Sequence, residues 1–453
     1  MVLATSNILY KPRPISPHSV TLPQFVLESL FVNKNMLKNL PQIALFLGAC
    51  AVTYVSSDAQ PAAAAQPFHV MCYYDERAGI DRGNDQGKVT PKNLLSGAQA
   101  EYCTHLIYGF AIVGNDSKSI QVRSAKSEEL YKDLAPLKAK GIKTLIALGG
   151  AEDSKNFEKY VKLVTNVDNR KAFVESVVAF LNKHKFDGLL LQWEYPVCRD
   201  GSDCTKGSVD ERTGYGELMK QLSEALKPKS FILAAGISPK IDVIDKAYNV
   251  QVLTKYLDFV LVEGYKYNQG YSKVFETQFY NVNTTTEPSV VNTIMQLHTK
   301  GVPLKKQVLG ISLAGNSYVL AAADKHGYGV AATGPGAAAE FTKLPGVMGY
   351  FEICNNVVNK GWKVVHERKN TVKLNPYAFK GNQLVTYEDT TDLLRKGKFI
   401  KDQKMLGAAV WSADLDDIRN ICKCGNFPML RALNQELRGE TVVPGKKMWE
   451  NCA

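Results

Sequence analysis

The sequence has no dense run of lysine and arginine, although its 453 residues carry 55 basic and 44 acidic side chains, a formal net charge of +11. An excess that is spread along the chain favours solubility and loose attraction to anionic surfaces. This spread of basic residues is not the clustered pattern of a nucleic-acid-binding protein. With 45% hydrophobic and 22% charged residues the composition is that of an ordinary globular chain, and we expect no nucleic-acid partner.

A membrane-spanning apolar stretch is also missing near the N-terminus. The run at 43–52 (IALFLGACAV) is too short to cross a bilayer comfortably, but it has the length of the apolar part of a signal peptide. Lys38 precedes it and small residues follow at 62–65. We therefore expect residues 1–66 to be a leader with a signal peptide, with Met36 as an alternative start. An uncleaved signal anchor or a long leader are the competing interpretations, and cleavage predicts a secreted, extracellular protein without a stable membrane span.

Closely spaced cysteine and histidine ligands are scarce. Removing residues 1–66 leaves 51 basic and 42 acidic residues, a net charge of +9, and eight cysteines. An even number of cysteines after a signal peptide fits disulfides in an oxidising compartment. No histidine accompanies the closest cysteines, so we predict no metal site and no cofactor. Asn115 and Asn283 begin glycosylation sequons, which also fit secretion.

From residue 68 onward, short β-type apolar runs alternate with longer amphipathic stretches. The stretch 169–184, for example, places Phe173, Val177, Phe180 and Leu181 on one helical face. Eight strand-like runs in about 370 residues predict an α/β fold, a (β/α)8 TIM barrel with a parallel sheet. The runs are 68–74, 105–111, 143–148, 188–191, 231–235, 259–262, 308–312 and 407–411.

The interval 313–404 is too long for a single barrel helix. It contains β-like segments of its own at 347–351 and 383–387. We therefore predict a small α+β insertion domain at 313–404, between strands seven and eight. The barrel, including this insertion, would span 67–437 and be followed by a tail at 438–453.

The functional site of such a barrel is expected at the carboxyl ends of the strands. Glu194, Tyr265 and Trp411 each follow an apolar run by one to three residues, so all three should lie on that rim. Each residue alone is explained as well by a polar strand end or a core aromatic. Their convergence on one rim favours a pocket.

The run DGLLLQWEYP at 187–196 resembles the D-G-x-D-x-D-x-E-Y-P signature of glycoside hydrolase family 18, the chitinases. The likeness covers nearly all of the mature chain, and the segment from Tyr195 to Gly207 resembles arthropod chitinase catalytic domains in particular. Further segments in family order are CYY at 72–74, YCTHLIYGF at 102–110, LGG at 148–150, YFEIC at 350–354, PYAFKGNQ at 376–383 and VWSADLDD at 410–417.

The resemblance also implies a disulfide pattern. It pairs Cys72 with Cys103, Cys354 with Cys422, and Cys198 with Cys204. Cys424 and Cys452 have no family partner, and pairing with each other is one solution.

Members of this family cleave β-1,4-linked N-acetylglucosamine polymers. The N-acetyl group of the substrate attacks the anomeric carbon while a glutamic acid protonates the leaving oxygen. By resemblance Glu194 is that acid, and Tyr265 is retained beside it. The two inner aspartates of the signature are Leu190 and Gln192 here, and the aspartate of a second motif, M-x-Y-D, is Lys266 within EGYK at 263–266.

These replacements bear directly on catalysis. Gln192 can form hydrogen bonds but cannot neutralise a developing positive charge. A Lys266 turned into the pocket would favour the ionised form of Glu194, which is the wrong state for a proton donor. We therefore predict that hydrolysis is lost or strongly reduced, and that Glu194 serves either as a sugar contact or only as a salt-bridge partner of Lys266.

Sugar binding depends on other residues. The resemblance implies a central aromatic floor at Trp411, while three family tryptophans are replaced by Arg77, Ala151 and Leu384 and a Tyr-Gly-Arg motif by AGN at 314–316. These replacements are expected to strip the outer subsites while sparing the central floor, so short oligosaccharides should bind and long chitin should bind weakly. The implied substrate-binding residues are Tyr73, Phe110, Gln192, Tyr195, Lys266 and Trp411.

Three functions remain open from the sequence. The leading prediction is a secreted, monomeric chitinase-like protein that binds chitin or chito-oligosaccharides. The first alternative is a slow endochitinase. The second is a growth-factor-like or immune signalling protein that acts through a cell-surface protein, as in the imaginal disc growth factors of insects.

Overall fold

The computed structural model describes residues 68–82, 87–199, 201–267, 270–275, 279, 289–369 and 372–439. The predicted leader, the sequon at Asn283, Cys452 and all but the first two residues of the predicted tail lie outside these ranges. Within them, no helix is both long and apolar enough to cross a membrane.

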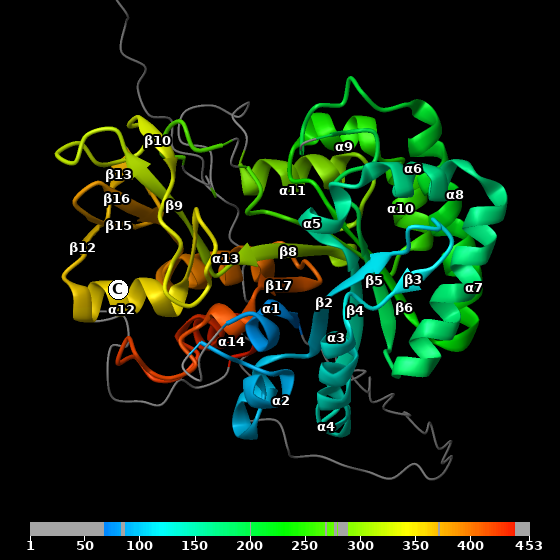
Figure 1. Cartoon of the computed structure of the whole chain (residues 1–453), viewed down its shortest axis with the longest axis horizontal. Helices are drawn as coiled ribbons and strands as arrows, with labels where there is room; N and C mark the ends of the chain where they lie inside the picture. Colours follow the sequence, from blue (N-terminus) through cyan, green and yellow to red (C-terminus); the bar gives the residue numbers. More distant parts are fainter. Residues whose placement is uncertain are drawn as a thin grey trace, which may run out of the picture. The chain divides into compact units, whose positions relative to one another are not determined.

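Eight parallel strands form a closed barrel surrounded by helices (Figure 1). The first strand pairs with both the second and the last, and this double pairing closes the ring. The fold predicted from the eight apolar runs is confirmed, and each strand begins within one residue of its run. The barrel strands are β1 (His69–Asp75), β2 (His105–Val113), β4 (Lys143–Gly149), β5 (Gly188–Gln192), β6 (Ile232–Ile237), β7 (Phe259–Val262), β8 (Gln307–Ser312) and β17 (Gly407–Trp411).

The strands are continuous apolar runs because a parallel barrel buries both faces of its sheet. All five residues of β5 are buried. Leu190 points into a core inside the barrel with side chains such as Met71 and Leu261, whereas its neighbour Leu189 belongs to the larger core under the helices. Gly188 has no room for a side chain, since a Cβ there would lie 2.3 Å from the carbonyl oxygen of Ile232 on β6.

The long helix that follows β4 shows how the outer layer forms. α7 begins after Asn166, whose side chain accepts a hydrogen bond from the Asn169 N–H at 3.0 Å. The face predicted from its helical spacing is buried. The helices are α1 (Arg77–Ile80), α2 (Pro91–Leu94), α3 (Ala125–Tyr131), α4 (Ala135–Ala139), α5 (Gly150–Ser154), α6 (Phe157–Thr165), α7 (Val167–His184), α8 (Val209–Leu226), α9 (Ile241–Ala247), α10 (Val250–Tyr256), α11 (Val290–Thr299), α12 (Tyr350–Lys360), α13 (Thr390–Asp402) and α14 (Pro428–Arg438).

A second, antiparallel sheet is built between β8 and β17, as predicted for an insertion between the seventh and eighth barrel strands. Its small core includes Tyr318, Tyr377 and Leu384, and α13 then leads back to the barrel and packs against α14. Its strands are β9 (Ala314–Leu320), β10 (Ala332–Pro335), β11 (Val347–Gly349), β12 (Lys363–Val365), β15 (Tyr377–Lys380) and β16 (Gln383–Thr386). Two short pieces pair separately, β13 (Arg368–Lys369) with β14 (Val372–Lys373), and β3 (Ile120–Gln121) extends β2 as a hairpin.

Three disulfides join pairs of cysteines within the described residues, and they are the three pairs that the resemblance implied. They join Cys72 to Cys103, Cys198 to Cys204 and Cys354 to Cys422. Cys424 is also disulfide-bonded, while the suggested partner lies outside the described residues.

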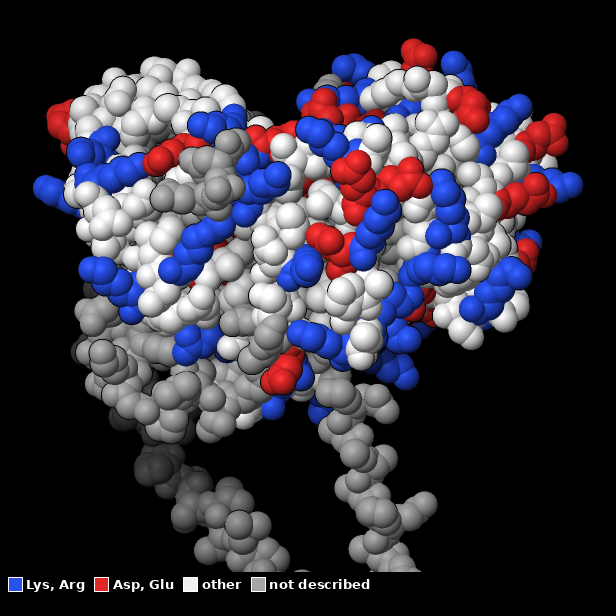
Figure 2. All heavy atoms as spheres, turned by 60° about the horizontal axis from the view of Figure 1, so that its bottom comes forward, with Lys and Arg blue, Asp and Glu red and all other residues white. Residues whose placement is uncertain are grey.

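Charged side chains are distributed over the surface. On the face drawn in Figure 2, lysine and arginine side chains lie among acidic and uncharged ones and do not form one continuous basic stripe. Asn115, the sequon asparagine within the described residues, is exposed in the turn between β2 and β3.

Candidate active site

A cleft of about 1570 Å³ lies at the carboxyl ends of the barrel strands, with walls from the barrel loops and from the insertion. Tyr73 is only 1% exposed and lies beneath the cleft floor. The other predicted site residues all line the cleft: Phe110, Gln192, Glu194, Tyr195, Tyr265, Lys266 and Trp411. Among the described residues no group of side chains is arranged to hold a metal ion.

Glu194 reaches the cleft because β5 ends two residues before it. Trp193 turns away into the core, where its ring stacks on Tyr160 with 5.1 Å between the ring centroids. The Glu194 N–H donates a hydrogen bond to Ser154 Oγ at 2.9 Å. These contacts fix the backbone at Trp193 and Glu194 and direct the Glu194 carboxylate into the barrel mouth.

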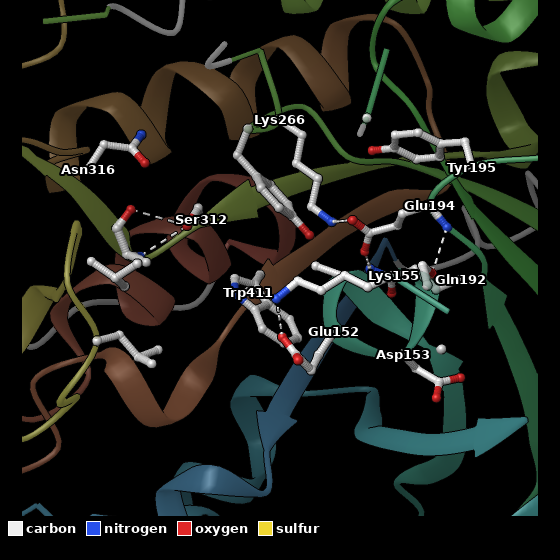
Figure 3. A pocket seen from close by; sticks show the side chains of 18 of the residues that line it. Glu152, Asp153, Lys155, Gln192, Glu194, Tyr195, Lys266, Ser312, Asn316 and Trp411 are labelled. Atoms are coloured by element: carbon white, nitrogen blue, oxygen red, sulfur yellow. Dashed lines mark hydrogen bonds and ion pairs between the residues drawn. The ribbon is translucent and has the colours of Figure 1, made fainter. Parts of the chain in front are cut away.

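Lys266 forms ion pairs with two carboxylates. Its ammonium group contacts Glu194 Oε2, and it lies 3.0 Å from Glu263 Oε1. Figure 3 shows Lys266 and Glu194 pointing toward one another across the cavity. The Glu194 side chain is 9% exposed and the Glu263 side chain is fully buried, whereas 27% of Lys266 remains accessible. Lys266 therefore occupies the space in front of Glu194.

Gln192 is fully engaged on its donor side. Its Nε2 donates hydrogen bonds to Glu194 Oε1 at 3.1 Å and to Glu263 Oε1 at 2.6 Å. Its Oε1 accepts a hydrogen bond from the Tyr73 hydroxyl at 2.9 Å. Because both N–H groups are used and the residue is 2% exposed, Gln192 links the protein's own side chains and has no N–H left for a ligand.

Glu263 is the residue of this network that the sequence analysis missed. It follows directly on β7 and also accepts a hydrogen bond from the Tyr195 hydroxyl at 2.8 Å. Burial raises the pKa of Glu263 to about 7; Lys266 opposes this shift and the charge of Glu194 adds to it. An acid that follows an apolar run was the pattern that singled out Glu194, and the same pattern was present at 259–263.

The ammonium of Lys266 stays charged. Burial alone would lower its pKa, but the adjacent carboxylates of Glu194 and Glu263 outweigh burial and raise the pKa above its ordinary value. The site therefore contains two carboxylates bridged by one cation.

The aromatic floor of the cleft lies at the end of β17. The Trp411 ring centroid is 5.1 Å from that of Tyr73 and 5.5 Å from that of Phe110. Phe110 in turn needs a glycine beside it, because a Cβ at Gly150 would lie 2.8 Å from the Phe110 ring. Trp411 and Phe110 are partly exposed, so they present aromatic surface to the cleft.

The comparison with known families agrees with this architecture. The sequence profile of the glycosyl hydrolases family 18 matches residues 69–416. The chain belongs to glycosyl hydrolase family 18. Probable chitinase 10 of Drosophila melanogaster is 37% identical over 390 residues, which are 84% of this chain and 16% of that protein. The matched region is thus a small part of that relative.

Two solved structures are similar to this family 18 chain, one from a chitinase and one from a pseudo-chitinase. Catalytic domain 2 of the Ostrinia furnacalis Group II chitinase has a TM-score of 0.77 and 32% identity, covering 85% of this chain and 100% of that one. Human YKL-39, described as a pseudo-chitinase with retained chitooligosaccharide binding properties, has a TM-score of 0.71 and 29% identity over 82% and 99% of the two chains.

The positions where this family 18 member lacks the expected tryptophans differ in their surroundings. Arg77 lines the cleft and is ion-paired with Asp75, and Ala151 also lines the cleft. Leu384 is fully buried within the insertion sheet. The first two changes remove aromatic surface from the cleft, and the third substitutes a core residue.

Proposed function

We propose that this protein binds chito-oligosaccharides in the barrel-mouth cleft and that hydrolysis is lost or strongly reduced. The observation that carries the proposal is the ion pair between Lys266 and Glu194. Secretion is part of the same proposal, and it is supported by the three disulfides, which persist in oxidising compartments.

Hydrolysis requires a proton on Glu194 and stabilisation of positive charge at the anomeric carbon. The ammonium of Lys266 contacts Oε2 of Glu194, and Gln192 Nε2 donates a hydrogen bond to its Oε1, so both oxygens of the expected proton donor are engaged by the protein itself. The same ammonium repels a cationic transition state. Loss of one well-placed electrostatic partner typically costs about a hundredfold to a thousandfold in rate.

Binding makes fewer demands than hydrolysis. A pyranose ring needs an aromatic face, and Trp411 presents one that is backed by Tyr73 and Phe110. That human YKL-39 is described as a pseudo-chitinase with retained chitooligosaccharide binding supports the same separation by analogy.

The experiment uses the purified protein with two assays. We expect no turnover of a fluorogenic chitotrioside and a measurable heat of binding for chitotriose, with Trp411→Ala weakening that binding about tenfold or more. Met295→Ala, an exposed side chain on α11 outside the cleft, serves as the control. Turnover near that of an ordinary chitinase would reject the loss of hydrolysis. If calorimetry detects no binding of chitotriose to wild type, and the Trp411→Ala variant gives the same result, a protein ligand would be favoured.

A slow endochitinase is the second candidate, and Glu263 is the observation that favours it. Its carboxylate contacts Gln192 and Lys266, so a second negative charge remains within the site despite the lost aspartates. In that case a weak turnover would be detected, and both Glu194→Gln and Glu263→Gln would abolish it. Turnover that survives Glu263→Gln would rule out this explanation.

A further inference from the structure

We propose that Phe157, backed by Arg199, forms a second sugar-stacking position at the rim of the cleft. Its ligand is a pyranose ring of an oligosaccharide that extends out of the central site. This inference rests on the proposed function, because it concerns how far along the cleft a bound oligosaccharide makes contact.

The first observation is the exposure of Phe157. It is the first residue of α6, it lines the cleft, and 40% of it is exposed. Among the described residues it is the one aromatic side chain in the group of exposed large hydrophobics. A phenylalanine at this position leaves apolar surface in water inside a sugar-sized groove, which is the surface that a pyranose face covers.

The second observation is that the Phe157 ring is held in place. The guanidinium carbon of Arg199 lies 4.3 Å from the ring centroid. Arg199 is itself fixed, because it donates hydrogen bonds of 2.8 and 3.1 Å to the carboxylate of Glu211, and both residues are buried. A ring that is already ordered loses little conformational entropy when a ligand stacks on it.

The third observation concerns the loop that carries Arg199. The disulfide between Cys198 and Cys204 closes this loop, and the Arg199 N–H donates to the Asp203 carbonyl at 2.7 Å. Ser202 within this loop and Lys206 just after it line the cleft with a hydroxyl and an ammonium, and the ammonium lies 3.2 Å from Asp203 Oδ2. The rim therefore combines the aromatic face of Phe157 on α6 with polar groups of the segment that carries Arg199.

Phe157 and the central floor are positioned by different elements. Gly150, the first residue of α5, packs against Phe110, which in turn contacts Trp411. Phe157 begins the next helix, α6, and packs on Arg199 of the segment after β5. We therefore expect that only a ligand with several sugars contacts both Trp411 and Phe157.

The test compares chitobiose with chitohexaose by calorimetry on four proteins: wild type, Phe157→Ala, Phe157→Trp and Met295→Ala. We expect Phe157→Ala to bind chitohexaose about tenfold more weakly than wild type and to bind chitobiose within twofold of wild type. Phe157→Trp should retain the affinity for chitohexaose, and Met295→Ala, whose side chain is 37% exposed outside the cleft, should change neither. Thermal melting confirms that each variant is folded.

The outcomes separate this inference from the proposed function. If Phe157→Ala binds both sugars as wild type does, the stacking position is refuted while oligosaccharide binding stands. An equal loss for chitobiose and chitohexaose also refutes it, because Phe157 would then act on the central site. If wild type binds neither sugar, the proposed function fails, and this inference fails with it.

Discussion

The two sides of the barrel mouth differ in what holds them together. On one side Trp411, Tyr73 and Phe110 pack by apolar contact between rings. On the other side Glu194 and Glu263 are bridged by Lys266, in a network of charges that have been taken out of water. Apolar packing tolerates the loss of a neighbour more readily than a buried charge tolerates the loss of its partner.

Under the proposed function, this difference would allow binding and hydrolysis to be separated in one cleft. Stacking on Trp411 needs only an intact aromatic face, whereas proton donation needs the correct charge on Glu194. One hydrogen bond connects the two sides, from the Tyr73 hydroxyl to Gln192 Oε1.

Rebuilding the charges should restore hydrolysis without changing the aromatic side. We expect the combined variant Leu190→Asp, Gln192→Asp, Glu263→Met and Lys266→Asp to raise turnover of a fluorogenic chitotrioside at least about a hundredfold. Adding Glu194→Gln to this variant is the control and should remove the gain. A folded variant that gains no activity would show that the lost charges are not what limits the reaction.

Removing the bridging cation should destabilise the protein. Lys266→Met leaves two neighbouring buried carboxylates uncompensated, and we expect a loss of about 3 to 4 kcal/mol in the free energy of unfolding, measured with urea at pH 7.5. Lys162→Met removes an exposed i,i+4 pair with Glu158 on α6 and should cost less than about 1 kcal/mol. Equal effects of the two substitutions would contradict a buried network.

The buried acid predicts a specific pH dependence. The pKa of Glu263 is about 7 in the folded protein and about 4.5 in the unfolded chain, so between these values the folded state binds more protons. Stability from this group is therefore highest below pH 4.5 and falls as the pH rises to 7, by up to about 3 kcal/mol.

Glu263→Gln isolates this contribution, because Glu76 and Asp416 also have a pKa of about 7 and titrate in the same range. The measurement is the difference in unfolding free energy between wild type and Glu263→Gln from pH 4.5 to 7.5. A difference that does not change with pH would show that folding does not raise the pKa of Glu263.

The smallest effect tests the connection between the two sides. Tyr73→Phe removes the hydrogen bond to Gln192 and should cost about 1 to 2 kcal/mol of stability. Combined with Lys266→Met, its effect should be less than additive, because both substitutions act on one network. Tyr74→Phe, which removes a buried hydrogen bond of 2.9 Å to the Val89 carbonyl, should add fully to Lys266→Met. Full additivity of both tyrosine variants would mean that the two sides are independent.

The strands could be predicted from the sequence because a strand that is buried on both faces is a continuous run of apolar residues. β5 is a continuous apolar run, and its carboxyl end places Glu194 at the rim of the barrel mouth. The position of Lys266 relative to Glu194 could not be predicted, because it depends on rotamers of side chains from two strands. The sequence predicted only what would follow if Lys266 pointed into the pocket, and the structure shows that Lys266 contacts Glu194.

Glu263 and Phe157 were not predicted as site residues, for different reasons. Glu263 was compared with a motif position and counted as part of a substituted segment, so its own place at a strand end was overlooked. Phe157 belongs to no motif, and nothing in the sequence distinguishes an exposed phenylalanine at a helix start from a buried one. Leu384 shows the opposite problem: its substitution suggested a change in the cleft, but its side chain lies in the insertion core.

The closure of the barrel has a consequence for the order in which the protein acquires its parts during synthesis. The ionic side comes from β5 and β7, in the middle of the chain, while the aromatic floor needs β17 beside β1. A ribosome therefore releases the residues of the charge network well before it makes Trp411. Retention on immobilised chito-oligosaccharide would then report full-length, closed chains, because any chain that terminates before Gly407 lacks both the closing strand and the floor.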